Sequence, residues 1–230
     1  GNHFIELGRV AEIFDREGAD LFKLSQDKLS ILIHTGSRGF GHQICTDYAA
    51  IMHKCAGRYG IELPSRGLAA VPIHSPEGKD YFAAMSAAIN FAFANRQIIT
   101  YDVRKAFGDY FQCPDTELDL GVVYDVAHNI AKFEEIEGRE ILIHRKGATR
   151  ALPPGHRGNP PVYRSYGHPV IIPGSMGTSS YVIVATPKVV ETFHSVNHGA
   201  GRIMSRRAAK RQITVEMLRK QLGQVLFHGD

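Results

Sequence analysis

The sequence predicts an α+β fold in which mixed β-sheets pack against helices. Three observations support this prediction. Short apolar runs typical of strands recur along the chain, a long segment with helical periodicity separates them, and no regular strand–helix–strand alternation joins them. Because no change in composition marks a boundary, residues 1–230 are treated as one domain.

The elements of the N-terminal half follow from local patterns. Residues 28–34 (KLSILIH) have a dense apolar centre and predict a buried strand. Residues 42–58 and 79–111 place apolar side chains at helical spacing, so both predict helices, the second with an interruption near Thr100. The segment 2–10 is short and mixed and predicts no defined element.

The C-terminal half predicts shorter elements. Apolar runs typical of strands occupy 121–127, 139–144, 168–172 and 180–185. Prolines and glycines predict a loop over 152–161, a short helix is expected over 188–195, and 199–201 predicts a tight turn. A helix is predicted over 202–222, and because seven basic residues accompany one acidic residue there, an anionic partner is favoured.

Composition narrows the class of protein. The chain has 230 residues, of which 43% are hydrophobic and 22% charged, a balance typical of a globular protein and unlike that of a disordered one. No apolar run approaches the roughly 20 residues that a membrane span needs, so no membrane association is expected. The three cysteines form no CxxC pair, which favours a reducing, cytoplasmic compartment. The chain lacks an initiator Met, and we expect it to be a piece of a longer protein.

Histidines give the first indication of chemistry. His3, His34, His128 and His198 fall at predicted strand ends or turns, each near Asn or Gly. Histidine is the usual metal ligand and proton carrier near neutral pH. Each histidine alone is more often structural, but four at such positions favour a site.

Small-residue loops give the second indication. They occupy 36–39, 174–180 and 199–201, and Arg38 and Arg202 lie within or beside them. Backbone N–H groups in such loops can approach phosphate oxygens, and arginine can hold a phosphate through two hydrogen bonds. None of these loops matches a known nucleotide-binding pattern, but together with the histidines they favour phosphate chemistry with a metal.

At this point the sequence resembles a known family, the RtcB family of RNA ligases. The resemblance covers essentially the whole chain, and its motifs occur in the family's order: Asn2-His3-Phe4-Ile5-Glu6, His34-Thr35-Gly36-Ser37-Arg38-Gly39, Asn90-Phe91-Ala92-Phe93-Ala94-Asn95-Arg96, Asp125-Val126-Ala127-His128-Asn129, His144-Arg145-Lys146-Gly147-Ala148-Thr149-Arg150, Pro173-Gly174-Ser175-Met176-Gly177 and His198-Gly199-Ala200-Gly201-Arg202.

The resemblance implies an enzyme that uses GTP and manganese to join an RNA 3′-phosphate or 2′,3′-cyclic phosphate to a 5′-hydroxyl. It acts in tRNA splicing and RNA repair, through a histidine–GMP intermediate. Its implied partners are tRNA halves or broken RNA ends and an archease-type activator. A metal-dependent RNA-end phosphoesterase and an RNA-binding fragment without activity stay open as alternatives.

The resemblance also implies roles for individual residues. His198 matches the guanylated nucleophile, and His3, His34 and His128 match manganese ligands. Arg38 and Arg202 are expected at RNA phosphates, where Arg145, Lys146 and Arg150 could also bind. The positions implied for GMP or GTP are Asn2, His3, Phe4, Ile5, Glu6, His128, Asn129, Pro173, Gly174, Ser175, Met176, Ser180, His198, Gly199, Ala200 and Gly201.

The sequence departs from the family at its ends. An N-terminal Asp and Cys that complete the family's two metal sites are missing, as is a C-terminal Lys that contacts GMP. We therefore expect weak manganese binding and no full ligation by this stretch alone.

Overall fold

The computed structural model describes residues 3–201, 203–223 and 225–227. The chain divides into two compact units. The first comprises residues 1–19 and 23–125, and the second comprises residues 20–22 and 126–230. No helix among the described residues is both long and apolar enough to cross a membrane.

The first unit contains an antiparallel hairpin. Strand β1 (Phe4–Arg9) pairs with β2 (Leu29–His34), and Phe4 lies opposite His34. Helix α1 (Arg16–Leu21) lies between them in sequence. The strand predicted over 28–34 is confirmed. Strand β1 was missed because its six residues alternate between a half-buried and an exposed face, so no dense apolar run marks it.

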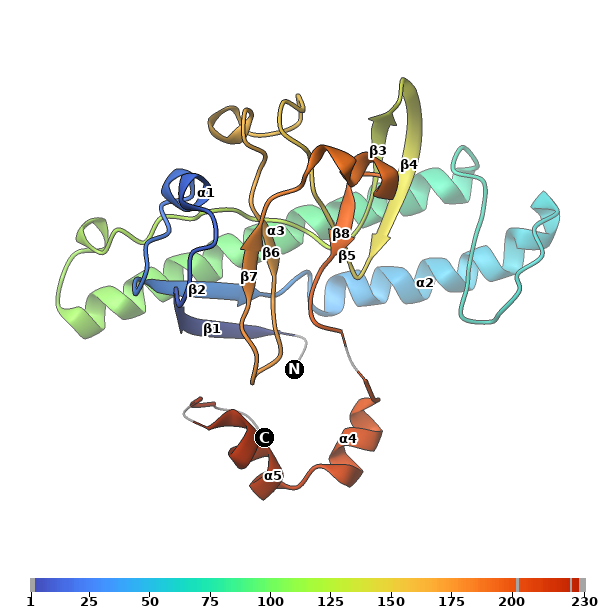
Figure 1. Cartoon of the computed structure of the whole chain (residues 1–230). Helices are drawn as coiled ribbons and strands as arrows, with labels where there is room; N and C mark the ends of the chain where they lie inside the picture. The colour runs from blue at the N-terminus through green and yellow to red at the C-terminus, as the bar shows by residue number, and fades with distance from the viewer. Residues whose placement is uncertain (1–2, 202, 224, 228–230) are drawn as a thin grey trace. The chain divides into compact units, whose positions relative to one another are not determined.

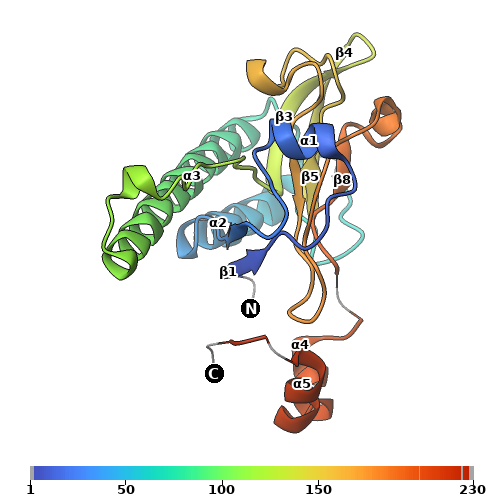
Figure 2. The ribbon, with the colours of Figure 1, turned by 60° about the vertical axis from the view of Figure 1, so that its left-hand side comes forward.

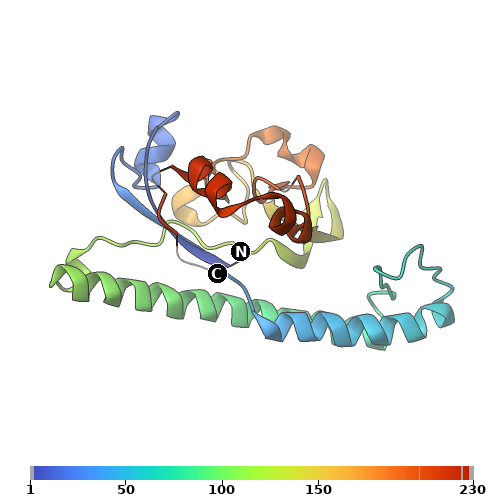
Figure 3. The ribbon, with the colours of Figure 1, turned by 90° about the horizontal axis from the view of Figure 1, so that it is seen from below.

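Two antiparallel helices complete the first unit. Helix α2 (Gly39–Cys55) packs along the N-terminal part of α3 (Pro76–Phe111) (Figures 1 and 3). The rings of Tyr48 and Tyr81 mark this contact, with centroids 5.5 Å apart. The helix predicted over 42–58 is therefore present but begins three residues earlier, and it passes into a 3₁₀ helix after Cys55.

Helix α3 is continuous, so the predicted interruption near Thr100 is wrong. The hydroxyl of Thr100 donates to the carbonyl of Arg96 at 2.8 Å, which accommodates the polar side chain within the helix. The helix begins where the hydroxyl of Ser75 accepts from the amide of Gly78, and it ends at Gln112, whose φ is 53°. The 3₁₀ helices among the described residues are Ala56–Tyr59, Asp115–Glu117, Pro161–Tyr163 and Pro187–Thr192.

The second unit begins with a tight hairpin of β3 (Asn129–Ile136) and β4 (Arg139–Lys146). The two residues between the strands, Glu137 and Gly138, have φ values of 50° and 74°, which is the geometry of a type I′ turn. The strand predicted over 139–144 is confirmed, but the one predicted over 121–127 is wrong. That apolar segment has no strand pairing, and the partner of β4 is the more polar segment that follows it.

Two further strand pairs lie in the second unit (Figures 1 and 2). Strand β5 (Ala148–Arg150) pairs with β8 (Ser195–Asn197), and β6 (Val170–Ile172) pairs with β7 (Tyr181–Ile183). The core beside them is formed by Ala151, Val170, Ala185 and Val189.

The α+β class is confirmed, but the mixed sheets are not. All strand pairs among the described residues are two-stranded and antiparallel. The strands predicted over 168–172 and 180–185 are present as shorter strands, because the residues between them close a hairpin.

The C-terminal region also differs from its prediction. The single helix expected over 202–222 is two helices, α4 (Arg206–Gln212) and α5 (Val215–Leu222). Ile213 is extended between them, and the hydroxyl of Thr214 accepts from the amide of Met217, which starts a new helix. The helix expected over 188–195 is the 3₁₀ helix Pro187–Thr192.

Candidate functional site

The four histidines singled out by sequence all stand at strand ends. His3 directly precedes β1, His34 is the last residue of β2, and His198 directly follows β8. His128 also borders a strand, although it precedes β3 instead of ending the strand predicted before it. His3 and His34 belong to the first unit, whereas His128 and His198 belong to the second.

The imidazole of His198 is held in a defined orientation. Its Nδ1 lies 2.8 Å from the carbonyl oxygen of Gly147, and its ring stacks on that of His128 with centroids 4.5 Å apart. Because a carbonyl oxygen can only accept, this hydrogen bond requires Nδ1 to carry the proton. The neutral ring then keeps its lone pair on Nε2, which is the state of a nucleophile.

The two small-residue loops of the second unit contact each other. The amide of Ala200 donates to the carbonyl of Pro173 at 3.1 Å, and a Cβ added to Gly199 would lie 3.2 Å from the same oxygen. This contact joins the loop that follows β6 to the loop that carries His198. The Ala200 amide is therefore engaged within the protein and is not directed at a phosphate in this conformation.

The loop between β6 and β7 is itself closed by side-chain hydrogen bonds. The amide of Gly174 donates to the hydroxyl of Ser180 at 3.1 Å, and the amide of Ser175 donates to the hydroxyl of Thr178 at 2.8 Å. A Cβ on Gly174 would lie 2.4 Å from the carbonyl oxygen of Ser179, so only glycine fits there. Met176, between these turns, is exposed.

The first unit contains a cavity of about 260 Å³ beside the hairpin. The residues that line it are His3, Phe4, Ile5, Ile33, Thr35, Arg38, Asn95 and Ile99. The Nδ1 of His3 lies 3.3 Å from the hydroxyl of Thr35, and the ring of Phe4 packs edge-on against His34 at 5.1 Å. The cavity thus contains several residues of the first two motifs, and Glu6 follows on the same strand.

Helix α3 supports the loop that precedes α2. The side-chain amide of Asn95 donates to the carbonyl of Gly36 at 2.9 Å, and Arg96 donates to the carbonyl of Thr35 at 3.2 Å. Arg96 also forms an ion pair of 2.6 Å with Asp125. These motifs are visible in the sequence but their supporting role is not, because the hydrogen bonds join residues about 60 positions apart.

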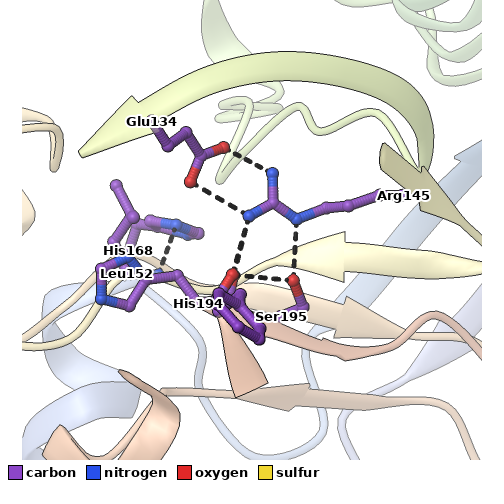
Figure 4. Close-up of polar contacts among 7 residues, drawn as sticks. Glu134, Arg145, Leu152, His168, His194 and Ser195 are labelled. Carbon is purple, nitrogen blue, oxygen red and sulfur yellow. Dashed lines mark hydrogen bonds and ion pairs between the residues drawn. The ribbon is translucent and has the colours of Figure 1, made fainter. Parts of the chain in front are cut away.

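Arg145 does not face solvent, as an RNA-phosphate ligand would. Its side chain is 1% exposed and forms two hydrogen bonds with the carboxylate of Glu134, which is itself buried (Figure 4). Lys146, by contrast, is exposed and donates to the side chain of Asn129 at 3.2 Å. The pairing of Arg145 with a buried carboxylate was not visible in the sequence, because β3 was not predicted.

Two further histidines are buried near this pair (Figure 4). The Nε2 of His168 accepts from the amide of Leu152 at 3.2 Å. Burial lowers the pKa of His168, and burial, followed by the charge of His156, lowers the pKa of His194. Both side chains are therefore uncharged structural groups at neutral pH.

Some predicted positions and sites are not assembled by the structure. Asn2 and Arg202 lie outside the described residues. No group of three or more His, Cys, Asp or Glu side chains among the described residues stands close enough together to hold a metal ion. Arg38 is exposed and has a φ of 55°, immediately before α2.

Known proteins are similar to this chain over nearly its whole length. The profile of the family described as tRNA-splicing ligase RtcB matches residues 1–227. The tRNA-splicing ligase RtcB of Pyrococcus furiosus is 51% identical over 228 residues, which cover 96% of this chain and 24% of that protein. The protein of the same name from Methanocaldococcus jannaschii is 52% identical over 214 residues, covering 91% of this chain and 22% of that protein. That from Archaeoglobus fulgidus is 48% identical over 227 residues, covering 96% of this chain and 47% of that protein. The chain thus spans about a quarter to a half of the length of these curated relatives.

Proposed function

Because the chain belongs to the tRNA-splicing ligase RtcB family, we propose that it carries the guanylated histidine of a GTP- and manganese-dependent RNA ligase. The proposed reaction joins an RNA 3′-phosphate or 2′,3′-cyclic phosphate to a 5′-hydroxyl, in tRNA splicing and RNA repair. The observation that carries the proposal is the hydrogen bond from His198 to the carbonyl of Gly147.

His198 is the proposed nucleophile. In the first step its Nε2 attacks the α-phosphorus of GTP, an N–P bond forms, and the bond to the bridging oxygen breaks so that pyrophosphate leaves. The carbonyl of Gly147 accepts a hydrogen bond from the protonated Nδ1 throughout, which stabilises the ring as it becomes positively charged. The RNA 3′-phosphate then takes the GMP from His198, and the 5′-hydroxyl finally displaces GMP to form the new phosphodiester.

The nucleotide is proposed to bind beside this ring. The contact of Ala200 with Pro173 supports this, because it places a small-residue turn next to the nucleophile. Ser175, Met176 and Ser180 belong to that turn, and Gly199 and Gly201 flank Ala200. In the first unit, Glu6 is the proposed partner of the guanine edge, since a carboxylate accepts from two adjacent N–H groups.

Manganese is proposed to bind His3, His34 and His128. Imidazole nitrogens combined with oxygen donors are an acceptable manganese set, and all three histidines flank strand ends. When bound, the metal would polarise the phosphate that is attacked. Exposed Arg38 is the proposed contact for RNA phosphates, and the basic helices α4 and α5 would add attraction that is independent of sequence.

The proposal extends to location and partners. Cys45, Cys55 and Cys113 are free thiols, the state that a reducing compartment maintains, and we propose a cytoplasmic location. By the same family membership, an archease-type activator is a proposed partner. Its addition should then accelerate the guanylylation of His198.

The proposed first step is tested with GTP labelled at the α-phosphate. The chain is incubated with labelled GTP and Mn²⁺ and then separated by denaturing electrophoresis. The matched variants are His198→Ala and His144→Ala, because His144 is an exposed histidine of the same unit. We expect an acid-labile label on the wild type and on His144→Ala, and none on His198→Ala.

Two outcomes would overturn the proposal. A label that survives in His198→Ala would place the nucleophile elsewhere. Absence of label in every sample, with RNA-end hydrolysis or RNA retention instead, would favour the phosphoesterase or the RNA-binding alternative.

A further inference from the structure

We propose that Arg145, held by Glu134, is a positioning residue that fixes the orientation of the His198 imidazole. This inference rests on the proposed function of His198. It concerns a buried ion pair whose hydrogen bonds, among the described residues, join Arg145 to Glu134 and to residues 193–195.

The guanidinium of Arg145 contacts the chain just before β8. Its Nε donates to the hydroxyl of Ser195 at 2.9 Å, and its Nη2 donates to the carbonyls of Phe193 and His194 at 3.1 and 3.3 Å (Figure 4). Ser195 is the first residue of β8, and His198 follows the last. Arg145 therefore holds the start of the strand that ends at the nucleophile.

The backbone of the turn before β8 has an unfavourable conformation. Phe193 and His194 have φ values of 51° and 50°, so two consecutive non-glycine residues are left-handed. Their carbonyls both point to the same guanidinium, and the carbonyl of His194 also accepts from the amide of Ala151 at 2.9 Å. These hydrogen bonds stabilise a turn that sequence alone disfavours, and the turn sets where β8 begins.

Arg145 also lies on the segment that orients His198 from the other side. The chain runs from Arg145 through Lys146 to Gly147, whose carbonyl accepts from Nδ1 of His198 at 2.8 Å. The contacts therefore form a closed ring of residues. It runs along the backbone from Arg145 to Gly147, through the hydrogen bond with His198, back along β8 to Ser195, and through the hydrogen bond between Ser195 and the Arg145 side chain. Pairing of Ala148 with Asn197 lies inside this ring.

Glu134 fixes the guanidinium within the ring. It accepts from Nη1 and Nη2 of Arg145 at 2.5 and 3.0 Å, and the two side chains are 9% and 1% exposed, respectively. A planar, bidentate pair of this kind has one geometry, which a lysine ammonium cannot reproduce. While paired with Glu134, Arg145 still donates from Nε and Nη2 to the turn before β8, so one side chain binds both Glu134 and this turn.

The test reads the His198 tautomer directly. The chain is prepared with ¹⁵N-labelled histidine, and the ring nitrogens are observed by NMR at a pH about two units above the ordinary histidine pKa of about 6.5. In the wild type we expect a single His198 ring with the proton on Nδ1. The assignment comes from the signal that is lost in His198→Gln.

Three variants separate positioning from folding. Arg145→Lys keeps the charge but loses the fork, and the paired replacement Arg145→Met with Glu134→Leu removes the charges while keeping apolar volume, so that no buried charge is left alone. Arg157→Lys is the matched control, because Arg157 forms an exposed ion pair with Glu135 in the same unit.

We expect both Arg145 variants to populate the Nε2-protonated tautomer and to slow guanylylation of His198 at least 10-fold, with the Kd for GTP changed less than 3-fold. Arg157→Lys should match the wild type in every measurement. A purely structural role would lower the Tm but leave the tautomer of the folded chain unchanged, and that result would overturn the inference. If the tautomer shifts as expected but no variant and no wild type is guanylylated, the proposed function fails while the positioning role stands.

Discussion

Substitution of Gly147 is the sharpest perturbation of the proposed nucleophile. Gly147 has a φ of 68°, and a Cβ added to it would lie 3.4 Å from Cε1 and 3.5 Å from Nδ1 of His198. In Gly147→Ala, the added Cβ therefore makes ordinary van der Waals contact with His198, but the backbone of residue 147 is strained. Gly138→Ala is the matched control, because Gly138 has a φ of 74° and open space around its Cβ position.

The magnitudes follow from these two features. A left-handed conformation costs a non-glycine residue about 1–2 kcal/mol, and the lower entropy of the unfolded chain offsets part of that cost. Both variants should therefore lose about 1 kcal/mol of unfolding free energy. The strained backbone at residue 147 displaces its carbonyl from His198, and the neutral hydrogen bond that is weakened in this way is worth about 0.5–1.5 kcal/mol. The guanylylation rate of Gly147→Ala should fall about 2- to 13-fold.

The assay pairs urea unfolding with single-turnover labelling by GTP. Equal losses of stability with a slower rate only in Gly147→Ala support the role of the Gly147 carbonyl. Equal guanylylation rates in the two variants would refute the reasoning, because the backbone strain is shared and only the contact with His198 differs.

Three further predictions concern the scaffold and the metal. Arg96→Met should lower the free energy of unfolding by about 2–3 kcal/mol, because it leaves Asp125 unpaired. The control Arg58→Met, at an exposed arginine, should change the free energy of unfolding by less than about 1 kcal/mol. Equal changes in the two variants, measured by urea unfolding, would contradict this prediction. Burial lowers the pKa of His168, so below about pH 6.5 the unfolded chain binds more protons than the folded chain. The contribution of His168 to the free energy of unfolding should be complete above that pH and should be lost as the pH decreases, so the free energy falls less steeply in His168→Leu. An equal fall with pH in the variant and the wild type, measured by urea unfolding, would refute the assignment. His34→Ala should weaken Mn²⁺ binding about 10-fold in calorimetry, whereas exposed His53→Ala should not, and equal affinities would exclude His34 as a ligand.

The sequence predicted the elements whose signals are local. The dense apolar run that became β2 and the helical periodicity of α3 both appear in the structure, since their patterns need no partner to be recognised. Strand β3 was missed because Lys132, Glu134 and Glu135 make it polar, and only its pairing with β4 identifies it. The apolar segment 121–127 failed for the opposite reason, since it is strand-like in composition but has no partner strand.

The candidate site was predictable in its residue types but not in its contacts. The motifs indicated His198 as the proposed nucleophile, yet the carbonyl of Gly147 that fixes its tautomer is 51 positions away in the chain. The sequence offers Arg145 only as one of several basic residues that could hold an RNA phosphate. Its burial against Glu134 depends on a strand that the sequence did not predict, so its role could be inferred only from the fold.

The central claim is that Nε2 of His198 becomes covalently bonded to GMP. The most direct measurement is mass spectrometry of the chain after incubation with GTP and Mn²⁺, with the adduct mapped by digestion under neutral conditions that preserve a phosphoramidate. We expect a gain of one GMP, located on the peptide that contains His198 and absent from His198→Gln. An adduct on another residue, or an unmodified chain, would contradict it.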